Sequence, residues 1–128
     1  MAALCSGADA IYLGAAAFGA RASAGFSQQE LKQVIDLYHF YGRRVYVTVN
    51  TLVKQCELDG VRDTLRMLSD LCADAVLVQD LGVLSLIARE FPHLCVHAST
   101  QMALHNAAGA RLARSLGMRR VVLARECT

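Results

Sequence analysis

Short runs of apolar, β-favouring residues alternate along this chain with segments whose apolar residues recur at helical spacing. This alternation predicts a parallel sheet built from right-handed strand–helix–strand units. The runs are nearly continuous in apolar residues, which is expected of strands whose two faces are both covered. We expect strands at residues 9–14, 45–49, 75–78, 94–98 and 120–124.

Boundary signals divide the intervening segments into helices. Ser27 and Glu30 have the spacing of a capping box, in which each residue satisfies a backbone amide at the start of a helix. Gly42 and Gly117 are predicted helix stops, and Pro92 ends a third helix. Residues 1–8 read as the tail of a helix, and a small-residue loop containing Phe18 and Arg21 spans residues 15–25. The four complete helices are expected at residues 28–41, 58–72, 81–90 and 106–116.

Polar residues follow four of the five predicted strands. In an open doubly wound sheet, function concentrates at one switch point, whereas a TIM barrel carries functional groups at the ends of many strands. A complete barrel needs about 250 residues, and this chain has 128. We therefore predict an α/β fold of alternating β/α units, with residues 1–128 forming one partial, TIM-barrel-like domain of about five strands and four helices.

Composition narrows the class of protein further. The chain is 55% hydrophobic and 19% charged, which favours a packed domain over a disordered one. A net charge of +2 does not by itself indicate nucleic-acid binding. No apolar run approaches the roughly 20 residues of a membrane span, and the first residues lack the basic segment of a signal peptide. We expect a cytoplasmic protein.

The five cysteines are far apart and include no Cys-x-x-Cys pair. This pattern favours neither a disulfide framework nor a zinc site, and it predicts reduced cysteines that are mostly small core residues.

Five segments together resemble peptidase family U32, the collagenase-like bacterial proteins. They run in order over essentially the whole chain and comprise residues 7–14, 46–52, 78–82, 97–101 with Asn106, and 122–126. The resemblance implies a bacterial cytoplasmic enzyme with a TIM-barrel-like domain. It also implies that the opening strand of the barrel precedes Met1 and that the cysteine-bearing signature follows Thr128, so that this chain is a fragment of the full enzyme.

The resemblance leaves the reaction open. Family members are described as peptidases of unknown catalytic type, whereas relatives hydroxylate tRNA or rRNA with prephenate as oxygen source, or hydroxylate ubiquinone without oxygen. The hydroxylating relatives resemble iron–sulfur proteins whose cluster cysteines lie beyond the matched region. No cofactor is therefore expected within this chain, although an iron–sulfur cluster fits the full-length parent.

Polar residues at the strand ends are the candidate site. Asp80 and Glu126 are the predicted general acid–base pair, and Arg125 suits a carboxylate or phosphate. Helix capping is the competing interpretation for Asp80 and Asn106, and turn closure for Ser99. The expected substrate-binding residues, whose amides and hydroxyls suit a carbonyl or a nucleobase edge, are Asn50, Gln79, Ser99, Thr100, Gln101 and Asn106.

The histidines do not predict a metal site, because no pair has His-x-x-x-His spacing on one helix and no acidic partner lies at ligand distance in the sequence. His97 with Ser99 suggests a serine hydrolase only weakly, since the Gly-x-Ser-x-Gly elbow is missing.

Three functional hypotheses follow. The first is a fragment of a U32 protease acting on peptides. The second is RNA hydroxylation, with part of the RNA-facing surface supplied by Arg111, Arg114, Arg119 and Arg120 unless these are simply a solvated helix face. The third is a non-catalytic half-barrel that assembles with a partner chain or with itself through open sheet edges.

Overall fold

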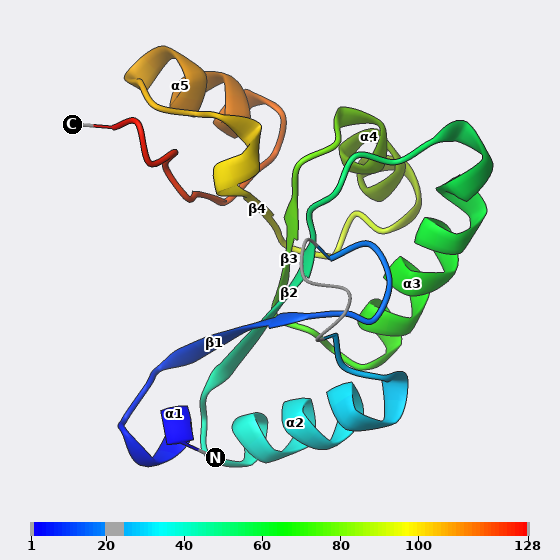
Figure 1. Ribbon diagram of the computed structural model, residues 1–128, viewed down its shortest axis with the longest axis vertical. Helices are drawn as coiled ribbons and strands as arrows, with labels where there is room; N and C mark the ends of the chain where they lie inside the picture. Colours follow the sequence, from blue (N-terminus) through cyan, green and yellow to red (C-terminus); the bar gives the residue numbers. More distant parts are fainter. Residues whose placement is uncertain (1, 20–24, 128) are drawn as a thin grey trace.

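A computed structural model describes residues 2–19 and 25–127. Its strands are all parallel and form one sheet in the order β1-β2-β3-β4-β5, so each strand pairs with its neighbour in sequence (Figure 1). The predicted alternating α/β fold is confirmed, and the sheet is open. The strands are β1 (Ala10–Gly14), β2 (Arg44–Val49), β3 (Ala75–Val78), β4 (Val96–Ala98) and β5 (Arg120–Val121).

Helices connect successive strands, and Figure 1 shows α2, α3 and α4 following one another around the same side of the sheet. The α-helices are α1 (Ala2–Cys5), α2 (Gln28–Phe40), α3 (Leu58–Asp70), α4 (Leu81–Glu90) and α5 (Ala107–Ser115). Two short 3₁₀ turns, η2 (Gln55–Glu57) and η3 (Thr100–Met102), follow β2 and β4. No helix of the described residues has the length and apolar character to cross a membrane.

The predicted boundary signals of α2 are confirmed. The Ser27 amide donates to Glu30 Oε2 at 2.8 Å, and the Glu30 amide donates to Ser27 Oγ at 3.4 Å, which completes the capping box. Gly42 and Gly117 follow the ends of α2 and α5 with φ of 66° and 89°, a left-handed conformation that glycine adopts without steric cost.

Side chains alternate between the two faces of the sheet. Val47 and Val76 point into the main core beneath the helices, together with Leu31 of α2 and Leu65 of α3, and all four are fully buried. The opposite face carries a smaller cluster built on Tyr46, Ala75 and Leu77. The sheet thus has one helix-covered face and one face with its own aromatic and polar side chains.

Three predicted elements extend at one end by two or more residues beyond the observed ones. β4 begins at Val96 rather than residue 94, and α3 ends at Asp70 because Cys72 adopts a left-handed conformation. β5 ends at Val121 rather than residue 124. The Ala124 amide donates to the carbonyl of Leu104 at 2.9 Å, a bond to the β4–α5 connection that turns the chain away from the sheet edge.

The prediction that the cysteines are mostly core residues was wrong. They are free thiols, as expected, but four are exposed and only Cys95 is half-buried. The exposed thiols lie at element ends and in connections, where the chain runs over the surface: Cys5, Cys56, Cys72 and Cys127.

In the predicted small-residue loop, the Phe18 carbonyl accepts a hydrogen bond from Thr51 Oγ1 at 3.1 Å, whereas Arg21 lies outside the described residues.

Candidate functional site

The carboxyl ends of β2, β3 and β4 meet at one edge of the sheet, as the sequence predicts. Asn50 follows β2, and its Nδ2 donates to Ser99 Oγ, which follows β4, at 3.2 Å. This bond passes over the end of β3, where Gln79 and Asp80 begin the next connection. Four predicted site residues are thus brought together; we call this edge the rim.

Asp80 holds the rim together by capping. Its Oδ1 accepts the amides of Gly82 and Val83 at 2.7 and 3.0 Å, at the start of α4. Its Oδ2 accepts the Val53 amide at 3.2 Å and so fixes the segment after β2. Asp80 therefore caps α4, as the capping interpretation predicts. Its role as a general acid or base stays a prediction.

The segment after β4 turns sharply before α5. Ser99 is 1% exposed, and its Oγ accepts the Gln101 amide at 3.3 Å, which starts η3. Asn106 caps α5 through Oδ1, which accepts the Gly109 amide at 2.8 Å. Thr100 is half-buried and Gln101 is exposed. Capping therefore accounts for the placement of Ser99 and Asn106, whereas the Gln101 side chain is available to a ligand.

A cavity of about 600 Å³ opens between the rim and helices α4 and α5. Gln79, Asp80 and Gln101 supply its polar lining. The remaining wall is largely aliphatic and includes Leu52, Leu104, Leu112 and Leu116. An apolar pocket with a few amide and carboxylate groups can hold a flat ring against its walls and read the polar edge of that ring.

Arg125 and Glu126 lie apart from this cavity. They come four and five residues after the end of β5, and both are exposed. Neither lines the cavity, and within residues 2–19 and 25–127 neither side chain makes a hydrogen bond or salt bridge. The early end of β5 is the reason, because the prediction assumed a strand that reached residue 124.

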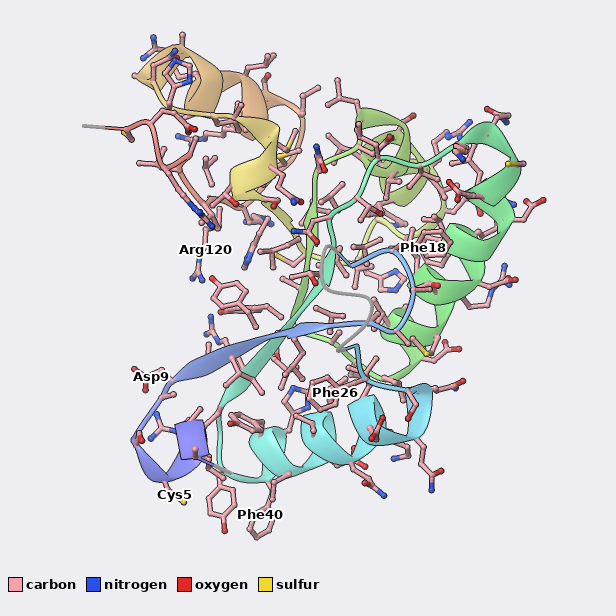
Figure 2. All side chains as sticks on the ribbon, viewed as in Figure 1. Cys5, Asp9, Phe18, Phe26, Phe40 and Arg120 are labelled. Carbon is pink, nitrogen blue, oxygen red and sulfur yellow. The ribbon has the colours of Figure 1, made fainter. Side chains whose placement is uncertain are left out.

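A second group of polar side chains lies on the uncovered face of the sheet and was not predicted. The Tyr12 and Tyr46 rings are 5.2 Å apart between centroids, and the Tyr46 and His97 rings are 4.8 Å apart. Arg120 Cζ lies 5.3 Å from the Tyr46 centroid, and Arg120 Nη1 donates to the Tyr12 hydroxyl at 3.4 Å. Figure 2 shows the Arg120 side chain reaching toward β1. Four strands contribute one residue each.

His97 is the buried member of this group. It is 4% exposed, and Nδ1 has no hydrogen-bond partner. Burial lowers the pKa of His97 to about 4, and the positive charge of Arg120 adds to the effect. The imidazole is therefore neutral near pH 7. Ser99 Oγ bonds to Asn50 and to the Gln101 amide rather than to His97, so no serine–histidine pair forms.

Within the described residues, no three histidine, cysteine or acidic side chains gather closely enough to hold a metal ion. The iron–sulfur cluster was expected of the full-length parent, with cysteines outside the matched region, and it stays a prediction.

The sequence profile described as peptidase family U32 matches residues 1–128. The chain belongs to peptidase family U32. It is 36% identical over 124 residues to the 23S rRNA 5-hydroxycytidine C2501 synthase of Escherichia coli K12, covering 97% of this chain and 18% of that protein. It is 34% identical over 121 residues to tRNA hydroxylation protein P1 of Bacillus subtilis 168, covering 94% of this chain and 29% of that protein.

The solved structure of a U32 peptidase shares the fold of this chain. The TM-score is 0.70 at 24% identity, covering 90% of this chain and 50% of that one. The U32 chain described here thus spans less than a third of the two curated relatives and half of the solved structure. The rim is the part of the shared fold at which parallel β/α proteins place their functional groups.

Proposed function

We propose that this U32 protein takes part in the hydroxylation of RNA, and that the rim cavity receives the nucleobase. The observation that carries the proposal is the lining of the cavity, where Gln79 and Gln101 stand against aliphatic walls. An amide offers both a donor and an acceptor, which is what a pyrimidine edge requires. The two curated relatives described above are named for hydroxylation of rRNA and tRNA.

Mass spectrometry of nucleosides tests the proposal. A strain that lacks the gene is expected to lose a hydroxylated cytidine or uridine from rRNA or tRNA, and the wild-type gene is expected to restore it. Gln101→Ala should restore about a tenth of the modification or less, because a lost hydrogen bond to a base edge costs about 1–3 kcal/mol. Gln29→Ala, an exposed change on α2, is the matched control. Unchanged hydroxynucleoside levels in the deletion strain would refute the proposal.

Peptide hydrolysis is the second candidate, because Asp80 places a carboxylate in the cavity lining. As a general base, Asp80 would need its charge, whereas as a cap it needs only an acceptor oxygen. Asp80→Asn keeps an acceptor and removes the charge. If the protein is a peptidase, Asp80→Asn should abolish cleavage of a denatured collagen substrate. It should also lower the stability of the protein by about 1 kcal/mol, because the amide nitrogen of Asn cannot accept the Val53 amide. Absence of cleavage by the wild-type protein would count against this candidate.

A further inference from the structure

A second cavity, of about 500 Å³, lies at the amino-terminal ends of the strands, on the edge opposite the rim. Parallel strands begin at a common edge, so the first residues of β2 and β5 and those just before β3 and β4 come together there. Its lining residues are Arg44, Tyr46, Asp74, Cys95, His97, Arg119 and Arg120.

The three arginines of this cavity have no carboxylate partners. Among the described residues, Arg44 and Arg119 form no salt bridge, and Arg120 interacts with the tyrosines Tyr12 and Tyr46 rather than with a carboxylate. Asp74 is the one carboxylate in the lining, and its Oδ2 already accepts the Val45 amide at 2.7 Å and lies 2.9 Å from His39 Nε2. The cavity therefore has an excess of unpaired positive charge.

This positive charge extends beyond the cavity. An adjoining cavity of about 650 Å³ shares Arg119 and Arg120 and adds Arg114. In the sequence, five arginines follow residue 90 against one acidic residue, Glu126. A concave surface lined by one sign of charge concentrates ions of the opposite sign.

His97 provides an independent sign of a ligand. Its side chain lines the arginine cavity and is 4% exposed, yet Nδ1 has no partner. A buried polar nitrogen without a partner destabilises a protein by about 1–3 kcal/mol, so such atoms are uncommon without a functional reason. A neutral imidazole can donate one N–H to an oxygen of a ligand.

We propose that this cavity binds a phosphoryl group, which Arg44, Arg119 and Arg120 hold by its oxygens while His97 Nδ1 gains a partner. Guanidinium groups make paired hydrogen bonds to phosphate oxygens, and several of them around one cavity match a group with several anionic oxygens. Small phosphate esters and the RNA backbone both present this group. The proposal does not depend on RNA hydroxylation, because a small phosphate satisfies the same arginines.

Calorimetric titration of the purified protein with inorganic phosphate at pH 7 tests the proposal. We expect saturable binding that Arg119→Gln weakens about tenfold, because a charge-assisted hydrogen bond contributes about 1.5–3 kcal/mol. Arg119 is exposed and has no described side-chain partner, so this variant should fold normally. Arg66→Gln on α3 is the matched control and should bind as wild type does. Absence of saturable binding, or equal binding by Arg119→Gln, would overturn the proposal.

The His97 ring gives a second readout, in a nuclear magnetic resonance titration with sulfate, which keeps its charge from pH 4 to 8. A bound anion favours the imidazolium, so the pKa of His97 should rise from about 4 when sulfate is present. The groups that share its surroundings are Tyr46, Arg120, Cys95, Asp74, Arg44 and Arg119. In Arg119→Gln the rise should be smaller. An unchanged His97 pKa in saturating sulfate would contradict binding beside this ring.

Competition identifies the source of the phosphoryl group. Adenosine monophosphate that displaces phosphate, with little dependence on salt, points to a small ester. A single-stranded RNA oligonucleotide that displaces phosphate, with an affinity that falls steeply with salt, points to the RNA backbone. Both results support the site, whereas failure of both compounds to displace phosphate would reject it. Loss of hydroxynucleosides in the deletion strain tests the proposed function separately.

Discussion

His97 couples protonation to folding at the scale of a single residue. In an unfolded chain its pKa is near 6.5, and in the folded protein burial and Arg120 lower it to about 4. The unfolded state therefore binds a proton at a pH at which the folded state does not. The contribution of His97 to the stability of the protein is therefore fully present above pH 6.5 and is lost as the pH falls toward 4.

We expect the free energy of unfolding in urea to fall by about 2–3 kcal/mol between pH 7.5 and pH 4.5 on account of His97. His97→Phe retains an aromatic ring beside Tyr46 and removes the titrating group. This variant should lose that part of the pH dependence, while His105→Phe, an exposed change, should keep it. Equal slopes for wild type and His97→Phe would show that His97 does not titrate on unfolding.

The positions of some candidate site residues could be predicted from the sequence, and those of others could not. Asn50, Gln79 and Ser99 could be placed at one edge because each follows an apolar run, and carboxyl ends of parallel strands share an edge. The same reasoning placed Arg125 at this edge, but Arg125 lies elsewhere because β5 ends at Val121. The Tyr12–Tyr46–His97–Arg120 group could not be foreseen, because its members meet only through the register of four strands.

At the scale of elements, α2 has the most complete set of local signals. The capping box fixes its start, and a left-handed glycine follows its end. Hydrogen bonds from the Ser27 hydroxyl and amide lower the pKa of Glu30. The contribution of the box is therefore present above the ordinary pKa of a glutamate and is lost as the pH falls below it.

Ser27→Ala should lower the free energy of unfolding by about 1 kcal/mol, because one amide at the start of α2 loses its acceptor. Glu30→Ala should add little to a chain that already carries Ser27→Ala, since the two side chains act together. Gln29→Ala, between them, is the control. Strict additivity in urea denaturation of the single and double variants would contradict a cooperative box.

The lengths of the elements were harder to predict than their kind. Helical spacing and continuous apolar runs depend on nearby residues, so each element type could be read locally. The end of β5 depends on a bond between Ala124 and Leu104, and the end of α3 depends on the backbone conformation of Cys72. Such boundaries are decided by tertiary contacts that no local pattern contains.

At the scale of the whole molecule, we expect backbone amides at the centre of the sheet to be the best protected from hydrogen exchange with solvent. The Val76 amide donates to the Cys95 carbonyl inside β3, which has a paired strand on each side. The Val122 amide donates to Ala98 beside the two-residue edge strand β5. We expect Val122 to exchange its amide hydrogen at least about tenfold faster than Val76. Equal rates, measured by nuclear magnetic resonance, would show that the sheet opens only as a unit.

The open parallel sheet was predictable as a class because the alternation of strands and helices spans the chain. The residues on its uncovered face could not be predicted. Nearly continuous apolar strands do not show which of their two faces the helices cover. The same openness keeps the arginine cavity on a surface that solvent reaches.

Strand order also bears on synthesis. Each strand of the described sheet pairs with the strand made just before it, and none waits for a later strand to be inserted between two neighbours. As the chain leaves the ribosome, β2 finds β1 already outside the tunnel, and β3 then finds β2. The sheet can therefore grow in the direction of translation, one strand and one helix at a time, as each new strand pairs with the edge that the preceding strand has just formed.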